Sequence, residues 1–483
     1  MLFNSFSFFV FFPLVTTLYF LFPHRARWAL LLFASCVFYM WFIPEYILIL
    51  AATIIVDYLA GIWIEESSTT QKKKFYFIFS IITTCLILFV FKYFNFFNYS
   101  VERLAHALGW NYHVEALQII LPIGLSFHTF QSLSYVIEVY RGHQKAERHF
   151  GIYSLYVMFY PQLVAGPIER PQNLLHQFYE KHDFDAERVA DGLKLMIWGL
   201  FKKIVIADRL ALFVNPVYDN PALHSGPILT IATVFFAFQI YCDFSGYSDI
   251  AIGSSQVMGF KLMDNFNRPY FSKSIAEFWK RWHISLSTWF RDYLYLSLGG
   301  NRCSKPRWWF NLFFTFLVSG LWHGANWTYI VWGGLNGFYL VFALWTKEAR
   351  SSIEKAVGLH RPSLLRKAWK IGVTFGLICF SWIFFRARDM ETAFTLIRGL
   401  RQGWSTSFLS SLTKTGFSTS QFILSWLLLA FLMFIHLIQR HGSIRHMLKD
   451  KPVWVRWSIY YLLVYGILLL GVFSKNEFIY FQF

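Results

Sequence analysis

Apolar runs long enough to cross a membrane recur from one end of the chain to the other. The hydrocarbon core of a bilayer is about 30 Å thick, and a helix needs about 20 apolar residues to cross it. By this length rule we expect about 12 helices. They are predicted over residues 3–22, 28–44, 46–64, 75–91, 118–140, 195–214, 228–248, 309–325, 327–345, 370–385, 422–438 and 454–473. The pattern predicts an all-α polytopic membrane protein that forms a single domain over residues 1–483.

A shorter apolar run over residues 152–165 does not fit this pattern. Pro161 interrupts it, and Gly166 and Pro167 end it. It is too short to cross a bilayer easily, so we expect a re-entrant segment. Non-helical backbone at membrane depth must be shielded by protein or line a wet cavity. The first apolar run lacks a basic leader and a small-residue cleavage site, so we expect it to be retained as a membrane span.

Composition supports the membrane assignment. Hydrophobic residues make up 56% of the 483 positions and charged residues 15%, whereas soluble domains carry about a quarter charged residues. A formal net charge of +17 would also be compatible with binding to nucleic acid. Here the basic residues lie in short loops between apolar runs, which is typical of cytoplasmic loops. We therefore expect the lipid bilayer as a partner and no nucleic acid.

The same basic loops predict an orientation. Placing five of their clusters in the cytoplasm puts both chain termini outside, and Arg386 and Arg388, which then also lie outside, count against this scheme. The five cysteines form no CxxC pair, and the histidines lack the spacing of ligands on one helix face, so no metal site is predicted.

The densest polar segment runs from Asn265 to Arg307. From Arg268 onward it contains eight basic and two acidic residues, with Trp and Tyr interleaved. Residues 275–298 are amphipathic and predict one helix at the cytoplasmic interface. This helix could be held by anionic lipid, or it could bind the phosphates of a donor such as a coenzyme A thioester. The candidate donor-binding residues are Asn267, Lys280, Arg281, Trp282 and Arg291.

Two histidines mark the candidate chemistry. His283 lies inside the polar segment, and His323 lies between two almost wholly apolar stretches. An ionisable group at membrane depth is costly and indicates function, although a neutral histidine bonded to a neighbouring helix would also fit. Imidazole has a pKa of about 6.5 and can accept a proton from a hydroxyl near pH 7. The small residues Gly320, Gly324 and Ala325 beside His323 would let another backbone or a substrate approach closely.

Asp243 and Asp249 place two carboxylates at the end of the apolar run over residues 228–248. Carboxylates at membrane depth face a cavity or a basic partner. The sequence leaves both interpretations open.

These segments together resemble the membrane-bound O-acyltransferase family, in its bacterial branch of alginate and peptidoglycan O-acetyltransferases. The resemblance covers essentially the whole chain, and the pair Arg281–Ser285 and Leu321–Gly324 is its most specific part. It implies a ring of about 11–13 transmembrane and re-entrant helices around a central funnel. It also implies that His323 is catalytic, that His283 is the supporting polar residue, and that Trp322, Asp243, Ser245 and Asp249 line the funnel.

The resemblance further implies an O-acyltransferase in the bacterial inner membrane. It would move acetyl from cytoplasmic acetyl-CoA to an extracytoplasmic polysaccharide or peptidoglycan hydroxyl, directly or through a periplasmic SGNH-type partner. Two alternatives remain: D-alanyl export to teichoic acid from a carrier-protein thioester, and a non-enzymatic glycan or lipid transporter. Many secondary transporters contain paired halves, and the absence of an internal repeat disfavours that class.

The C-terminus carries a separate hypothesis. Four of the last six residues are aromatic, which is typical of an interfacial anchor. The tail also resembles that of a small partner in the D-alanyl branch, whose tyrosine is thought to carry the acyl group briefly. Tyr480 is therefore a candidate acyl relay, because a phenol is a better leaving group than a sugar hydroxyl and a covalent relay splits one difficult transfer into two.

Overall fold

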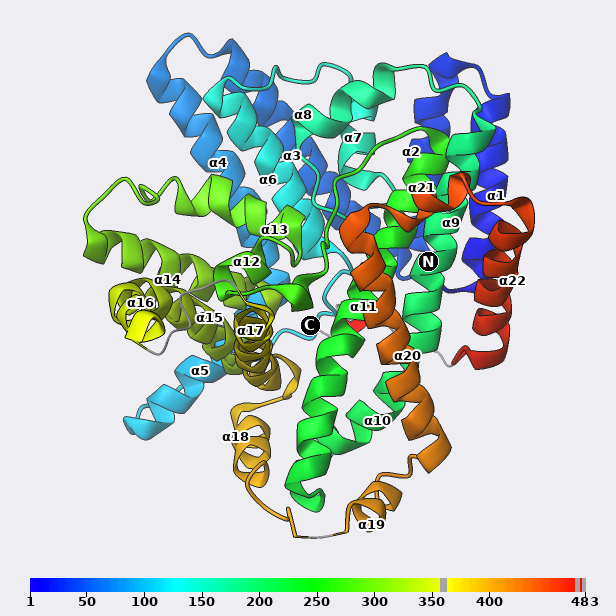
Figure 1. Ribbon diagram of the computed structural model, residues 1–483. Helices are drawn as coiled ribbons and strands as arrows, with labels where there is room; N and C mark the ends of the chain where they lie inside the picture. The colour runs from blue at the N-terminus through cyan, green and yellow to red at the C-terminus, as the bar shows by residue number, and fades with distance from the viewer. Residues whose placement is uncertain (357–362, 406, 474–477, 480–483) are drawn as a thin grey trace. The chain divides into compact units, whose positions relative to one another are not determined.

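The computed structural model describes residues 1–356, 363–405, 407–473 and 478–479. Within these ranges the chain is helical, without a β-strand (Figure 1), and the predicted all-α class is confirmed. Two compact units are present. Unit 1 comprises Met1–Met196 and Tyr247–Met263, and unit 2 comprises Ile197–Gly246 and Asp264–Phe483. Two of the three boundaries fall inside α9 (Ala186–Leu200) and α11 (Gly226–Met258), and the third follows Met263 in the loop after α11.

Unit 1 is built mainly from eight helices that precede α9. They are α1 (Phe6–Leu21), α2 (His24–Met40), α3 (Ile47–Glu66), α4 (Thr70–Leu88), α5 (Phe94–Ala107), α6 (Leu125–Arg141), α7 (Phe150–Met158) and α8 (Pro171–Leu174). Short 3-10 segments are η1 (Pro44–Tyr46) and η3 (Leu175–Tyr179), and a π-helical segment, η2 (Phe89–Tyr93), joins α4 to α5. Helices α3, α4 and α6 pack together in pairs, and α2 packs on α7.

Unit 2 contains the C-terminal half of the chain. Its helices are α10 (Asp208–Asp219), α12 (Ile275–Trp279), α13 (Ile284–Trp289), α14 (Lys305–His323), α15 (Trp327–Trp345), α16 (Lys347–Ala356), α17 (Leu364–Arg386), α18 (Met390–Gly399), α19 (Phe408–Thr413), α20 (Thr419–Ile438), α21 (Ile444–Lys449) and α22 (Val453–Leu470). Two π-helical segments, η4 (Phe201–Ala207) and η7 (Phe290–Tyr295), interrupt the regular helices. The 3-10 segments are η5 (Pro221–Leu223), η6 (Pro269–Phe271) and η8 (Gln439–His441).

The predicted apolar runs all contain helices. Seven described helical segments are long and apolar enough to cross a membrane. The others are shorter or more polar, and the run predicted over 118–140 becomes helical only at Leu125, after a left-handed Gly124. The run over 152–165 is confirmed as too short to cross, because α7 spans nine residues and the buried turn after it is not helical.

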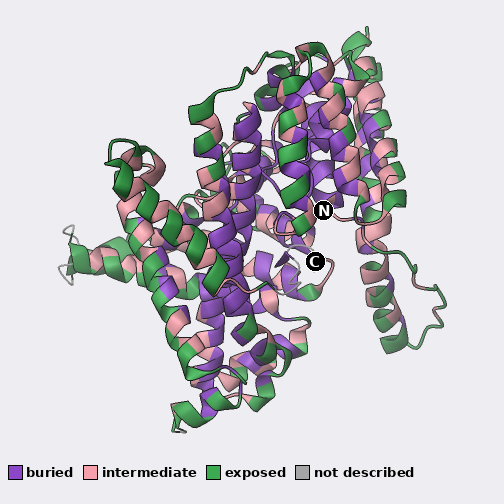
Figure 2. Ribbon diagram, turned by 90° about the vertical axis from the view of Figure 1, so that its right-hand side faces the viewer, coloured by how far each residue is buried: buried purple, intermediate pink, exposed green. Residues whose placement is uncertain are grey.

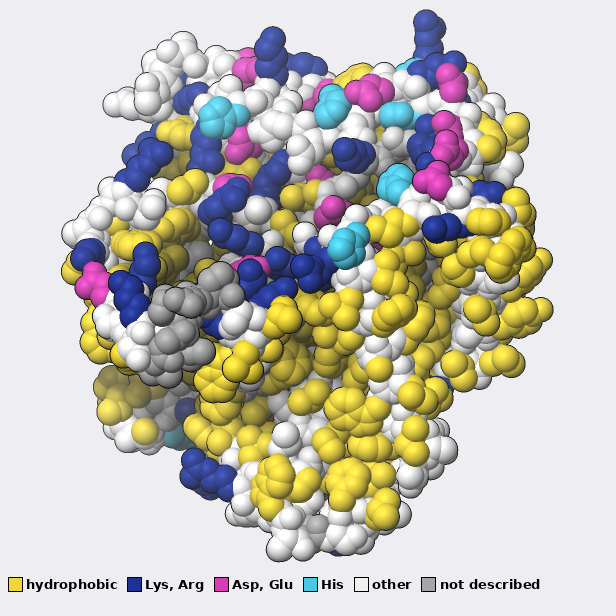
Figure 3. Space-filling model, in the orientation of Figure 1, with side chains coloured by type: hydrophobic (Ala, Val, Ile, Leu, Met, Phe, Trp, Pro, Cys, Tyr) yellow, Lys and Arg dark blue, Asp and Glu magenta, His cyan; other side chains and the backbone are white. Residues whose placement is uncertain are grey.

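Figure 2 shows that some helices are almost completely buried, whereas others carry long exposed faces. The exposed face of α20 includes Ile423, Leu427 and Phe434, and hydrophobic side chains dominate the surface over this helix (Figure 3). Helix α22 has no buried residue although its mean hydropathy is 1.6. Such surfaces are stable only against lipid. The chain is therefore a multi-pass membrane protein.

A buried polar cluster joins three helices of unit 1. The Asp57 carboxylate on α3 accepts hydrogen bonds from Ser80 (2.6 Å) and Thr84 (3.0 Å) on α4, and from Ser132 (2.5 Å) on α6. The Ser132 hydroxyl also pairs with the Tyr153 hydroxyl at 3.0 Å. Without a hydrophobic force between helices in lipid, such bonds contribute to helix association.

Helices α14 and α15 of unit 2 make an antiparallel hairpin in which the two backbones touch. A Cβ atom added to Gly333 would lie 2.4 Å from the Phe316 carbonyl oxygen, and one added to Gly320 would lie 2.3 Å from the Tyr329 carbonyl oxygen. Small residues permit this close approach between membrane helices. The prediction that Gly320 admits another backbone is confirmed. His323, the last residue of α14, follows three residues later.

We predict that Gly333→Ala destabilises the hairpin and that Gly334→Ala does not. The new methyl group at 333 meets backbone, and overpacking of this kind costs about 1–3 kcal/mol. A methyl group at 334 makes only ordinary contact, with the Leu317 side chain at 3.8 Å. Thermal unfolding of the two purified variants in detergent should therefore separate them by several degrees. Equal midpoints would contradict the close backbone contact.

Candidate active site

His323 is the last residue of α14, and its side chain is enclosed by aromatic rings of unit 2. The residue is 4% exposed. The imidazole centroid lies 4.9 Å from Trp322, 4.9 Å from Trp332 of α15, and 5.3 Å from Phe385 of α17. The Trp332 ring stands at 88° to the imidazole. These packed neighbours restrict the rotation of His323, as required of a base that must meet a hydroxyl in one geometry.

His283 lies at a break in the polar segment. The prediction of one continuous helix over residues 275–298 is wrong, because α12 ends at Trp279 and a separate α13 begins at Ile284. Between them His283 adopts a left-handed conformation with φ of 42°. This conformation costs a non-glycine residue about 1–3 kcal/mol and is concentrated at functional sites. The break turns the His283 side chain into the interior of unit 2, where the residue is 1% exposed.

Asn265 holds this break in place. Its main-chain oxygen accepts a hydrogen bond from the Ile284 amide at 3.0 Å. Its side-chain Oδ1 accepts from the Ser285 amide at 3.2 Å and from the Ser285 hydroxyl at 2.7 Å. The Asn267 amide adds a bond to the Arg281 carbonyl at 2.9 Å. These bonds satisfy backbone groups that a broken helix leaves without intrahelical partners.

Trp322 connects the two histidines. Its ring centroid lies 6.3 Å from His283 and 4.9 Å from His323. On its other side His283 meets the Phe244 ring edge-on at 4.5 Å. Burial lowers the pKa of the His283 imidazole to about 3, so His283 is neutral at pH 7. A neutral imidazole can donate one hydrogen bond and accept another, which suits a group that orients a substrate.

The predicted funnel-lining residues lie on α11 and, for Trp322, on α14. Asp243 and Ser245 belong to unit 2 and are 3% and 1% exposed. Asp243 pairs with Lys203 at 2.6 Å, and Ser245 accepts a hydrogen bond from Lys202 at 2.8 Å. Of the two interpretations that the sequence left open, a cavity or a basic partner, Asp243 therefore fits the basic partner. Asp249 is half-buried and lies in unit 1.

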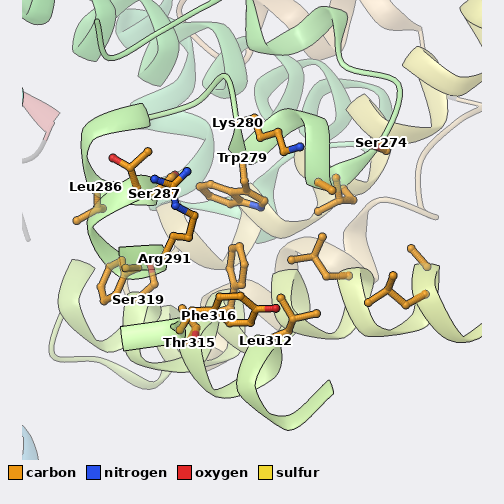
Figure 4. Close-up of a pocket in the computed structure, with 18 of the residues that line it drawn as sticks. Ser274, Trp279, Lys280, Leu286, Ser287, Arg291, Leu312, Thr315, Phe316 and Ser319 are labelled. Atoms are coloured by element: carbon orange, nitrogen blue, oxygen red, sulfur yellow. The ribbon is translucent and has the colours of Figure 1, made fainter. Parts of the chain in front are cut away.

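A groove with a volume of about 670 Å³ opens beside α12, α13 and α14. Its walls are mostly apolar and include Trp279 and Phe316, whose rings meet edge-on at 5.3 Å. Lys280 and Arg291 are the basic residues of its lining, and Figure 4 shows both among the side chains around the Trp279 ring. The groove also reaches Ser319. Ser319 precedes His323 by about one helical turn, or about 6 Å along the α14 axis.

The other predicted donor-binding residues occupy different positions. Arg281 lies outside the groove lining and pairs with Glu277 at 2.7 Å. Trp282 is 1% exposed and packs on Trp382 at 5.1 Å, so it belongs to the aromatic core. Tyr480, the candidate relay, lies outside the described residues. No group of three or more His, Cys, Asp or Glu side chains within the described ranges is arranged to hold a metal ion.

The sequence profile of the MBOAT, membrane-bound O-acyltransferase family matches residues 149–385. This range contains both histidines. A protein named "Probable alginate O-acetylase AlgI" from Pseudomonas aeruginosa is 39% identical over 438 residues, which cover 89% of this chain and 81% of the relative. A protein of the same name from Pseudomonas putida is 36% identical over the full length of both chains.

The chain belongs to the membrane-bound O-acyltransferase family. It is accordingly an O-acyltransferase. A third relative, named "Peptidoglycan O-acetyltransferase", from Helicobacter pylori, is 35% identical over 396 residues, covering 77% of this chain and 73% of the relative. The resemblance stated from the sequence is confirmed at the level of the family.

Several residues around the acyltransferase site were not predicted. Trp332 and Phe385 enclose His323, and Asn265 holds the turn at His283. Their roles depend on contacts between distant segments, so no local pattern reveals them. Lys203 did give a signal, because two adjacent lysines, Lys202 and Lys203, lie inside the apolar run over residues 195–214. Buried basic residues in such a run require a partner.

We predict that His323→Ala lowers acyl transfer by about 10²–10⁴-fold, the usual loss on removing a general base. His283→Ala should also impair turnover, because its ring contacts the same Trp322. His436 provides a matched control, since it is also buried in unit 2 (5% exposed) and its Nε2 lies 3.1 Å from the Tyr241 hydroxyl. The measurement is acyl transfer in membranes with equal protein levels. His323→Ala activity within about tenfold of the parent would exclude His323 as the base.

Proposed function

We propose that this acyltransferase is a transmembrane O-acetyltransferase of the bacterial inner membrane. It takes acetyl from cytoplasmic acetyl-CoA and delivers it to an extracytoplasmic polysaccharide or peptidoglycan hydroxyl. The acetyl assignment is supported by the names of the relatives at 35–39% identity. The single structural observation that carries the proposal is the groove that reaches from Lys280 and Arg291 to Ser319, one turn from His323.

The groove suits the two chemically different parts of acetyl-CoA. Lys280 and Arg291 would offer charged donors to phosphate groups. Arg291 also pairs with Asp292, with its Nε 2.7 Å from Oδ1. The apolar walls formed by Trp279, Phe316 and Leu312 suit the pantetheine arm, which must lie extended to bring the thioester to the enclosed histidine. A donor held in this way would lie along α14 with its thioester directed toward His323.

The transfer step needs a base and a means of orienting the carbonyl group. His323 would take the proton from the acceptor hydroxyl as its oxygen attacks the acetyl carbon. A new C–O bond forms, the C–S bond breaks, and the departing coenzyme A thiolate receives a proton. His283, neutral and fixed in its turn, would orient the carbonyl oxygen as a hydrogen-bond donor.

The acceptor side involves a second proposal. A periplasmic SGNH-type partner could complete transfer to the glycan, with Tyr480 carrying the acetyl group between the two proteins. An acetyl-tyrosine would form when the phenol oxygen attacks the thioester carbon and coenzyme A leaves as the thiol with the phenol proton. It would be consumed when a second hydroxyl attacks the ester and the tyrosine phenol is released with that hydroxyl's proton. The support for this step is the aromatic C-terminal sequence and the position of the residue before it, Ile479, which is 4% exposed within unit 2.

We predict that reversing the charge of the groove weakens donor binding. The double variant Lys280→Glu/Arg291→Glu should raise the donor KM at least about tenfold, and the parent KM should rise with salt because screening weakens exposed charge contacts. The matched control Arg302→Glu/Lys305→Glu makes the same charge change in the same polar segment at exposed residues outside the groove lining. An unchanged KM in the groove variant would leave only the lipid-anchoring interpretation of this segment.

The function itself is tested by mass spectrometry of the envelope glycans from strains with and without the protein. We expect acetyl esters to disappear in the deletion strain and to return with the parent but not with His323→Ala. Loss of D-alanyl esters instead would support teichoic acid export. Glycan translocation without consumption of a thioester, in membranes containing the purified protein, would support a transporter. Either of those results would overturn the acetyltransferase assignment.

A further inference from the structure

The segment after α22 is attached to unit 2 by main-chain groups. The Leu470 carbonyl oxygen accepts a hydrogen bond from Arg209 at 2.6 Å. The Val472 amide donates to the Ile204 carbonyl oxygen in η4 at 3.0 Å. The Ile479 amide donates to Oδ2 of Asp243 at 2.7 Å. Each of these three hydrogen bonds uses a backbone group of Leu470, Val472 or Ile479, so none of them depends on the identity of a side chain at these three positions.

The surroundings of the Asp243 carboxylate favour a hydrogen bond from the Ile479 amide. Its other oxygen, Oδ1, lies 2.6 Å from the Lys203 ammonium, which also lies 3.0 Å from Asp208. The three side chains are 3–8% exposed. A buried carboxylate requires both a counter-charge and donors for its remaining lone pairs. Lys203 supplies the charge, and Ile479 supplies a charge-assisted hydrogen bond, which is stronger than a neutral one.

The attached segment also reaches the candidate active site. Phe478, next to Ile479, is 2% exposed, and its ring lies 5.8 Å from the Phe244 ring. Phe244 in turn meets the His283 imidazole edge-on at 4.5 Å. Asp243 and Phe244 are neighbours on α11, so one short stretch of this helix both binds the C-terminal segment and contacts His283.

We propose that Asp243 is a positioning residue: through the Ile479 amide it seats the C-terminal segment against Phe244 and thereby fixes His283 for the transfer reaction. The catalytic part of this proposal rests on the proposed function, whereas the seating of the segment does not. The anchor is also separate from the Tyr480 relay, because it requires the amide of Ile479 and not the phenol hydroxyl.

The seating is tested without any activity measurement. Full-length protein in detergent is digested with a carboxypeptidase, and the products are followed by intact mass. We expect the parent to resist removal of Ile479 and Phe478, and Asp243→Asn to lose both at least about tenfold faster. Ser245→Ala, which breaks the Lys202 contact two residues away on α11, should remain within about twofold of the parent. Equal digestion of the parent and Asp243→Asn would overturn the anchor.

The effect on catalysis is tested by a double-mutant cycle in the full chain. Ile479→Pro removes the amide donor, because proline has no N–H, and Ile479→Val keeps it. We expect Asp243→Asn and Ile479→Pro each to lower kcat about tenfold or more, with the donor KM within about twofold of the parent. The double variant should be no worse than the more impaired single variant, since Asp243→Asn weakens the same hydrogen bond that Ile479→Pro removes. Ile479→Val should resemble the parent.

Three outcomes would contradict the catalytic part of the proposal. The first is a multiplicative loss in the double variant, and the second is equal activity of Ile479→Pro and Ile479→Val. The third is a loss confined to donor KM. If Asp243→Asn does not fold, the Ile479→Pro and Ile479→Val pair still decides the question, because it leaves the buried ion pair intact. Absence of acetyl transfer in the parent would refute the proposed function, while the digestion result would still report on the anchor.

Discussion

Close contact between the backbones of α14 and α15 is the constraint on which the active site depends. Gly320 and Gly333 bring the two helices together, and any Cβ atom at either position would collide with a carbonyl oxygen of the partner helix. Because the helices meet so closely, His323 at the end of α14 lies directly beside Trp332 of α15. A wider separation would leave the imidazole free to rotate. The reactivity assigned to His323 is thus a consequence of where small residues occur on two neighbouring helices.

His283 is positioned by a break between two short helices and not by a close contact between two long ones. His283 adopts a left-handed backbone conformation. Asn265 offsets the conformational cost by accepting hydrogen bonds from the two residues after His283, Ile284 and Ser285. An unbroken amphipathic helix through this segment would expose one polar face to the interface. The break instead divides the segment. Lys280 and Arg291 line the groove, whereas His283 and Trp282 lie in the interior of unit 2.

Buried charge in unit 2 has a structural explanation in the same region. Lys202 and Lys203 belong to the π-helical segment η4. Lys202 donates a hydrogen bond to Ser245 of α11, and Lys203 forms an ion pair with Asp243 of α11. A π-helix displaces the regular backbone bonding pattern, and the Ile204 carbonyl of η4 accepts the Val472 amide. The irregular segment therefore serves three purposes: it neutralises a carboxylate, anchors α11, and offers a main-chain acceptor to the chain after α22.

The sequence by itself determined the all-α membrane architecture, the positions of the long apolar helices, the family, and the two histidines. These are local properties, because the length of an apolar run and the residues within a short motif can be read without knowing what they touch. Tertiary structure decided the break at His283, the aromatic enclosure of His323, and the bond from Ile479 to Asp243. That bond joins residues 236 positions apart. A contact of this kind depends on how the helices pack, and no periodicity or composition along the chain encodes it.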